Sequence, residues 1–107
     1  MKIGNVLVGC GNHPFVIAEM SGNHNQSLER AIAIVEAASK SGVHAIKLQT
    51  YTADTITLPV NRGEFFIDDE NSLWKGQYLY DLYKQAYTPW EWHKPIMERA
   101  YKLGMAC

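Results

Sequence analysis

The sequence has little cysteine and no excess of charge, and both features exclude several classes of protein. Its only cysteines are Cys10 and Cys107, so it has neither a disulfide framework nor the Cys/His spacing of a zinc site. The formal net charge is -1, which provides no basic surface for nucleic acid or an anionic membrane. No apolar run approaches the ~20 residues of a membrane-spanning helix, and the first residues do not resemble a signal peptide. We therefore expect a cytoplasmic protein with reduced thiols that binds neither nucleic acid nor membranes.

Glycine motifs that bind nucleotide phosphates are also missing. Neither GxGxxG nor GxxxxGK[ST] occurs in the 107 residues. With 47% apolar and 20% charged residues, the composition is ordinary for a globular protein. The function must therefore be sought in individual residues and their places in the fold.

The first half of the sequence predicts a hairpin followed by a strand, a helix and a second strand. Residues 1–13 are interpreted as an N-terminal β-hairpin. The apolar run 15–19 predicts a strand buried on both faces, as in parallel sheets. Apolar residues at helical spacing, between a capping Ser27 and a stop at Gly42, predict a helix. Residues 43–49 predict a second strand that runs parallel to the first.

The second half is less regular. Residues 50–76 follow no period, and such a long connection is usually functional or carries minor structure of its own. A short amphipathic helix is expected over 78–86. Thr88 and Pro89 predict the start of another helix, with Thr88 as its cap and a bend at Pro95. A third strand is expected from Met105.

This order of elements predicts an α/β fold. We interpret residues 14–107 as the N-terminal part of a barrel domain, with two βα units and the start of a third strand. The pattern alone fits both a closed (β/α)8 barrel and an open doubly wound sheet. Because a chain rarely ends one step into a core strand, we expect further βα units beyond Cys107.

Two charged residues lie where such folds carry their chemistry, at the carboxyl ends of the parallel strands. Glu19 ends the first predicted strand, and Lys47 lies near the end of the second. Gln49 shares a strand face with Lys47 because the two are two residues apart. A purely structural role as a buried ion pair is the alternative for Glu19 and Lys47. For the segment 23–25, Asn-His-Asn, the alternative is a cluster of turn residues.

Three stretches carry a resemblance to a known family. Residues 17–25, Ile-Ala-Glu-Met-Ser-Gly-Asn-His-Asn, resemble the IAE-x-x-x-NHN segment of the sialic acid synthase family. Residues 47–50, Lys-Leu-Gln-Thr, resemble its K-x-Q-T segment. The Trp- and Tyr-rich stretch 72–93 is similar to the branch of the family that makes pseudaminic acid.

The resemblance implies a partial TIM (β/α)8 barrel, followed in the full-length enzyme by an antifreeze-like domain, in a homodimer. It implies condensation of phosphoenolpyruvate with a 2,4-diacetamido-2,4,6-trideoxy hexose, with C–O cleavage, to give pseudaminic acid and phosphate. A divalent metal (Mn²⁺, Mg²⁺ or Co²⁺) would polarise the sugar aldehyde. The alternatives are an N-acetylneuraminate or legionaminate synthase, or a non-catalytic sugar-binding or assembly fragment.

The resemblance also implies roles for residues of this chain. Glu19 and Lys47 match catalytic positions of the family. The matches to substrate-binding positions are Gln49, Asn23, His24 and Thr50. The metal ligands are expected beyond Cys107, so none is assigned here, and this segment alone is expected to be inactive.

Overall fold

The structure, a computed structural model, describes residues 1–107 and has a small parallel sheet at its centre. Strands β3 (Ile17–Glu19) and β4 (Ala45–Lys47) pair in parallel, as the strand–helix–strand interpretation predicts. Both strands are shorter than predicted. Their register places the last residue of β3 beside the last residue of β4. The two strands therefore end together, at one edge of the sheet.

A third extended segment lies on the other side of β4. Ala106 forms a parallel bridge with Ala45, and its backbone N–H donates to the carbonyl of His44 at 3.0 Å. The turn into this segment passes through Gly104, whose φ of 79° favours glycine. The predicted start of a third strand after this glycine is confirmed.

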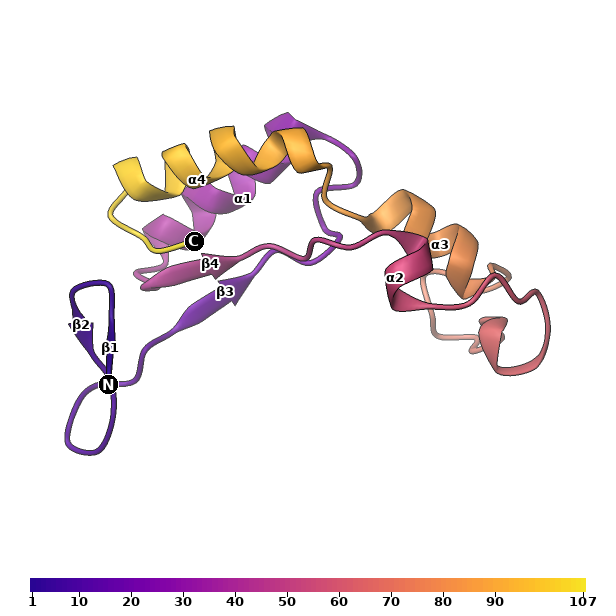
Figure 1. The fold of residues 1–107 in the computed structure, drawn as a ribbon, viewed down its shortest axis with the longest axis horizontal. Coiled ribbons are helices and arrows are strands. Elements are labelled where there is room, and N and C mark those ends of the chain that lie inside the picture. The colour runs from indigo at the N-terminus through magenta and orange to yellow at the C-terminus, as the bar shows by residue number, and fades with distance from the viewer.

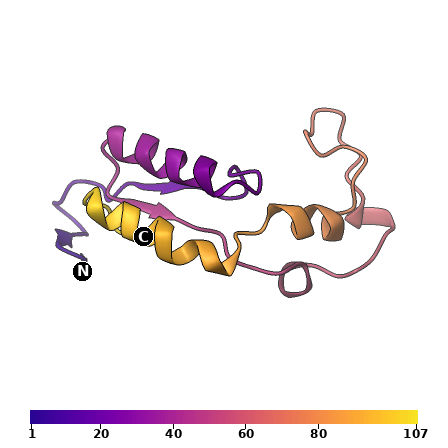
Figure 2. The ribbon, with the colours of Figure 1, turned by 90° about the horizontal axis from the view of Figure 1, so that it is seen from above.

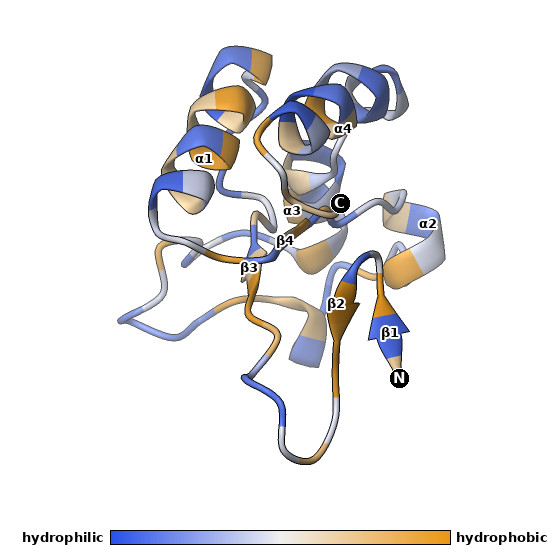
Figure 3. Cartoon of the chain, turned by 90° about the vertical axis from the view of Figure 1, so that its left-hand side faces the viewer, coloured by the Kyte–Doolittle hydropathy of each residue, from blue (hydrophilic) through white to orange (hydrophobic).

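Two helices cover one face of the sheet. Figures 1 and 2 show α1 (Leu28–Lys40) and α4 (His93–Lys102) side by side over β3 and β4. Val35 from α1, Ile96 from α4 and Ile46 from β4 are at most 1% exposed and belong to one apolar cluster. Figure 3 shows the alternating hydrophobic and hydrophilic bands along α1 that this one-sided packing requires.

The predicted ends of α1 are confirmed. The Ser27 hydroxyl accepts a hydrogen bond from the backbone N–H of Arg30 at 3.2 Å, which satisfies one of the free donors of the first turn. Gly42 follows the helix with φ of 77°. Glu36 on α1 is also paired with Arg99 on α4 at 2.6 Å, which links the two helices at their surface.

The prediction that the first strand is buried on both faces is wrong. Val16 and Ile17 are 47% and 48% exposed, whereas Ala45 and Ile46 are at most 6% exposed. The reason is that α1 and α4 both cover the same face of the sheet. The apolar run identified a strand but could not show how much of it the chain itself covers.

The start of α4 also differs from the prediction. A 3-10 turn, η2 (Trp90–Trp92), precedes the α-helix, and Thr88 does not cap it. Thr88 instead turns its hydroxyl towards His24. Pro95 lies in the first turn of α4, where a backbone N–H has no partner within the helix, so proline removes no helical hydrogen bond at this position.

The irregular segment extends away from the sheet, at the right of Figure 1. It contains α2 (Ala53–Ile56), the 3-10 turn η1 (Gly63–Phe65) and α3 (Leu79–Ala86). The prediction of minor structure within 50–76 is therefore confirmed, as is the short helix that follows. We call residues 51–87 the outer lobe.

The N-terminal strands β1 (Lys2–Ile3) and β2 (Val6–Leu7) pair antiparallel. Gly4, in the turn between them, has φ of 57°. In Figure 1 this hairpin lies apart from the helices. None of the helices has the length and apolar content needed to cross a lipid bilayer.

Candidate functional site

Glu19 and Lys47 form an ion pair at the ends of β3 and β4. They are partners in the strand register, and Lys47 Nζ lies 2.7 Å from Glu19 Oε1. The two side chains are 55% and 57% exposed, so the alternative of a buried ion pair is wrong for this chain. A pair this accessible contributes only about 0–1 kcal/mol to stability. Both charges are within reach of a ligand.

Gln49 and Thr50 follow β4 but lie in different surroundings. Gln49 is exposed and lines a cavity beside the sheet. Thr50 is hydrogen-bonded to Nε2 of His93, whose Nδ1 bonds to the carbonyl of Trp90 at 2.9 Å. Since a carbonyl can only accept, Nδ1 of His93 carries a proton, and in the neutral ring Nε2 accepts from the Thr50 hydroxyl. The Thr50 hydroxyl is thus engaged with the protein.

The loop after β3 is held in an unusual conformation. Three of its residues that are not glycine have positive φ: Ser21 at 50°, Asn25 at 47° and Gln26 at 54°. Such conformations cost of order 1–3 kcal/mol each and persist only where surrounding contacts enforce them. Their concentration in residues 21–26 indicates that contacts from outside the loop hold its shape.

Contacts with the outer lobe enforce this loop shape. The side-chain amide of Gln26 donates to the carbonyls of Gln85 and Tyr87, both at 2.7 Å. A Cβ placed on Gly22 would lie 3.1 Å from the carbonyl oxygen of Ala86, so only glycine fits at this approach without displacement. Sequence reasoning did not identify Gln26, because its partners lie 59 and 61 residues away.

His24 is part of the same connection and is fully buried. Its Nδ1 accepts the backbone N–H of Gln26 at 3.2 Å, so Nε2 carries the proton and donates to Thr88 Oγ1 at 3.3 Å. The ring also meets the edge of Trp92, with centroids 5.3 Å apart. Burial lowers the pKa of His24, which favours the neutral form that this geometry requires.

We expect acid to weaken this part of the fold. Because the pKa of His24 is lower in the folded chain than its ordinary 6.5, the unfolded chain binds the proton first. The contribution of His24 to stability is therefore constant above about pH 6.5 and falls as the pH decreases below it. Melting temperatures of the complete gene product between pH 7.5 and 5 should show this slope. The slope of melting temperature against pH should be shallower in His24→Gln. His13→Gln, at an exposed site, is the control and should keep the slope of the parent. Equal slopes in the parent and both variants would contradict this account.

A cavity of about 660 Å³ lies between the ends of the strands and the outer lobe. Ser21 and Gln49 line it, and each is two residues beyond a member of the ion pair. Asn23 also lines the cavity, and its side-chain amide donates to the carbonyl of Met20 at 2.9 Å. No charged residue lines the cavity. The site therefore has a charged end at the strands and a neutral end beside it.

Aromatic rings form part of the wall contributed by the outer lobe. Tyr51, Trp74 and Tyr83 all line the cavity, and the rings of Tyr51 and Tyr83 meet edge to face at 5.5 Å. Burial, with a smaller contribution from Tyr83, raises the pKa of Tyr51, so its hydroxyl remains a donor at neutral pH. Neutral polar groups together with aromatic faces are typical of sites for small uncharged ligands.

No group of three or more His, Cys, Asp or Glu side chains is arranged to hold a metal ion. The residues present therefore do not form the ligand set of a divalent cation. We assign none of them to a metal.

The fold and the site together define a class of protein. Parallel strands joined by helices, with a carboxylate, an amine and a polar cavity at their carboxyl ends, are typical of α/β enzymes. The family model described as "NeuB family" matches residues 34–107. The chain belongs to the NeuB family.

Two curated relatives carry different names. The chain is 45% identical over 107 residues to the pseudaminic acid synthase of Campylobacter jejuni subsp. jejuni serotype O:2, covering 100% of this chain and 30% of that protein. It is 35% identical over 92 residues to the N,N'-diacetyllegionaminic acid synthase of Legionella pneumophila, covering 85% of this chain and 25% of that protein. The chain thus spans less than a third of the length of either relative.

A solved structure supports the fold. The N-acetylneuraminic acid (sialic acid) synthetase from Leptospira borgpetersenii serovar Hardjo-bovis, in complex with citrate, aligns with a TM-score of 0.73 at 25% identity. The alignment covers 98% of this chain and 31% of that one. The arrangement of strands and helices described above is therefore one that a sialic acid synthetase contains.

Proposed function

We propose that the complete gene product carrying this chain is a phosphoenolpyruvate-dependent pseudaminic acid synthase. In this proposal residues 14–107 form the first part of a (β/α)8 barrel, with the hairpin 1–13 ahead of it. The full protein is a cytoplasmic homodimer with a C-terminal antifreeze-like domain. The observation that carries the proposal is the exposed ion pair of Glu19 and Lys47 at the ends of adjacent parallel strands, next to a neutral polar cavity.

The charged end suits phosphoenolpyruvate and the reacting carbons. The ammonium of Lys47 offers a fixed positive charge to the anionic substrate and to the oxyanion that forms during the reaction. The carboxylate of Glu19 holds Lys47 in place at 2.7 Å and can move a proton at a sugar hydroxyl or stabilise a developing cation. These roles are the ones that the resemblance to the family implies for the two positions, and the charges of the two side chains are compatible with them.

The reaction joins two carbon skeletons and releases phosphate. The enol carbon of phosphoenolpyruvate attacks the aldehyde carbon of a 2,4-diacetamido-2,4,6-trideoxy hexose. Water adds to the cation left at C2, and the tetrahedral intermediate loses phosphate as its C–O bond breaks. The product is a nine-carbon 2-keto sugar acid. A divalent metal (Mn²⁺, Mg²⁺ or Co²⁺) belongs to the proposal for the complete enzyme, but no residue of this chain is assigned to it.

The remaining candidate site residues fall into two groups, those that line the cavity and those that are hydrogen-bonded to other side chains. Gln49 and Asn23 line the cavity, and in this proposal they bind the sugar. Thr50 and His24 are bonded to His93 and Thr88, so in this proposal they position the site and do not bind substrate directly. Direct binding through His24 would require a fully buried ring to leave its partners.

An N-acetylneuraminate or legionaminate synthase is the second candidate. The specific observation in its favour is the legionaminic acid synthase among the relatives, at 35% identity. The pseudaminic acid synthase matches better, at 45% over the whole chain, and this includes the outer lobe. The two candidates share the charged end of the site and differ only in the sugar.

Phosphate release by the complete gene product tests the function. With phosphoenolpyruvate and a divalent metal, we expect release only when an acetamido sugar is added, and faster with the 2,4-diacetamido-2,4,6-trideoxy altrose than with N-acetylmannosamine. With ¹⁸O in the bridging position of phosphoenolpyruvate, the label should appear in the released phosphate because the C–O bond breaks. Faster turnover of N-acetylmannosamine would favour the second candidate, and release without any sugar would contradict both.

A further inference from the structure

The C-terminal end of α3 has carbonyl groups that its own backbone does not satisfy. The carbonyl of Gln85 would bond to the N–H of residue 89 if the helix continued, but Pro89 has no N–H. Tyr87, which follows the helix, is extended, and its N–H makes no capping bond to the last turn. The backbone around α3 therefore leaves this helix end open.

Gln26 caps this end from a distant part of the chain. Its side-chain nitrogen, Nε2, donates one hydrogen to the carbonyl of Gln85 and the other to that of Tyr87, each at 2.7 Å. Donors are favoured here because the last carbonyls of a helix carry a partial negative charge. The two donors of the amide therefore make the connection to α3.

The backbone of Gln26 shows that its side chain has a purpose. Its φ is 54°, a conformation that glycine adopts without cost and that other residues adopt rarely. If the position served only the shape of the loop, glycine would suit it better than glutamine. The bonds to α3 are what the glutamine side chain adds.

The helix that Gln26 caps forms a large part of the cavity wall. Five of the 14 residues that line the cavity belong to α3: Leu79, Leu82, Tyr83, Gln85 and Ala86. The helix packs against α2 within the outer lobe, and Figure 1 shows both of them away from the sheet. The hydrogen bonds that join the loop 21–26 to the outer lobe both come from Gln26. Gln26 itself does not line the cavity.

We propose that Gln26 is a positioning residue of the synthase: by capping α3, it holds the outer wall of the cavity in place for the sugar. The inference rests on the proposed function for the reaction and adds a residue that acts on sugar binding without touching substrate. When the cap is lost, the wall is in place in only a fraction of the molecules, and the apparent affinity for the sugar falls by that fraction. Phosphoenolpyruvate, at the charged end of the site, is affected little.

Three replacements separate the donors of Gln26 from its shape. Gln26→Glu keeps the size and removes both donors, and Gln26→Gly suits the positive φ but has no side chain. Gln26→Lys restores donors on a side chain that is one atom longer, with a charge that suits a helix C-terminus. In the complete gene product, we expect Gln26→Glu and Gln26→Gly to raise the KM of the sugar about tenfold. Both should leave kcat and the KM of phosphoenolpyruvate nearly unchanged, and Gln26→Lys should restore the KM of the sugar to nearly that of the parent.

Hydrogen exchange reports on α3 without any turnover. The backbone amides of residues 79–87 should exchange faster in Gln26→Glu and Gln26→Gly than in the parent, while those of residues 32–40 in α1 keep their rates. Asn61→Asp is the matched control, because it also changes an amide to an acid, at an exposed residue of the outer lobe. It should behave as the parent does in both measurements.

The outcomes separate this inference from the proposed function. Faster exchange over 79–87 together with a higher KM for the sugar, both reversed in Gln26→Lys, supports the inference. Unchanged exchange in Gln26→Glu overturns it, whatever the protein catalyses. Faster exchange with an unchanged KM for the sugar also overturns it and leaves the proposed function intact. Absence of phosphate release from the folded parent contradicts the proposed function instead, and the exchange rates then still decide whether Gln26 holds α3.

Discussion

Replacing Lys47 with methionine is expected to lower kcat/KM for phosphoenolpyruvate by about a thousandfold in the complete gene product. The substitution removes the charge and shortens the unbranched side chain by one atom. A fixed charge that faces a developing oxyanion is worth about 10²–10³ in rate, and Lys47 would also help to bind the anionic substrate. Steady-state phosphate release at several phosphoenolpyruvate concentrations measures the loss.

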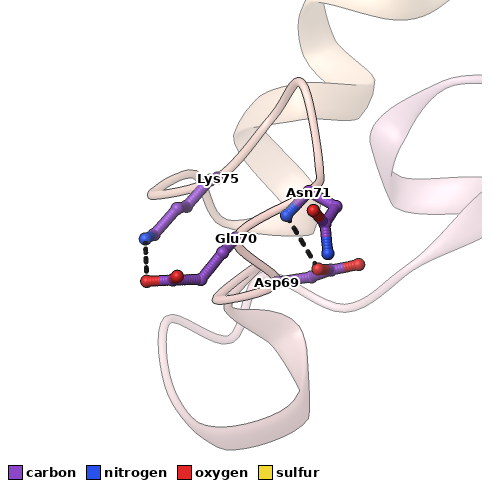
Figure 4. A network of polar contacts seen from close by, with 4 residues as sticks. All are labelled: Asp69, Glu70, Asn71 and Lys75. Atoms are coloured by element: carbon purple, nitrogen blue, oxygen red, sulfur yellow. Dashed lines mark hydrogen bonds and ion pairs between the residues drawn. The ribbon is translucent and has the colours of Figure 1, made fainter.

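A second exposed ion pair supplies the control for Lys47→Met. Lys75 lies 2.9 Å from Glu70 and is 49% exposed, close to the 57% of Lys47 (Figure 4). Lys75→Met removes an equivalent pair away from the strand ends and should change kcat/KM less than twofold. Both variants should melt within a few degrees of the parent, because exposed pairs contribute little to stability. If Lys47→Met unfolded the protein while Lys75→Met did not, the pair would be structural and its catalytic assignment would fail.

Local signals in the sequence predicted the elements that position the site. The Ser27 cap and the Gly42 stop bracket α1 because each acts on residues within one helical turn. The helix between two apolar runs predicted parallel strands, and the register of Glu19 with Lys47 brings together two residues that the sequence could place only at neighbouring strand ends. Residues in α1 and β4 are therefore well predicted from their nearest neighbours in sequence.

Contacts between segments that are far apart in the sequence could not be predicted from such local signals. Thr88 has the sequence context of a helix cap, yet its hydroxyl meets a histidine 64 residues away. Gln26 is unremarkable in sequence, but its amide joins two carbonyls of the outer lobe and helps to hold its own backbone at a positive φ. The exposure of Glu19 and Lys47 likewise depends on which face of the sheet the helices cover. In each case the deciding interaction is a tertiary contact. The helix, strand and turn propensities of the neighbouring residues do not indicate it.

Glu19→Gln is expected to lower kcat by about a hundredfold or more, with the fold retained. The amide keeps the shape of the carboxylate and can still bond to Lys47, but it cannot accept a proton and does not stabilise a cation. The effect should appear in kcat with both phosphoenolpyruvate and the sugar saturating. A loss confined to the KM of the sugar would instead make Glu19 a binding residue.

The double variant Glu19→Gln/Lys47→Met tests whether Glu19 and Lys47 act together, which neither single variant can show. The two side chains touch at 2.7 Å, so the proposal treats them as one unit at the reacting carbons. Residues that act as a unit are strongly non-additive: once one is lost, removing the other costs little more. We therefore expect the double variant to be about as slow as Lys47→Met alone, near a thousandfold below the parent. A loss near the product of the two single effects, about 10⁵, would mean that Glu19 and Lys47 act independently on separate steps.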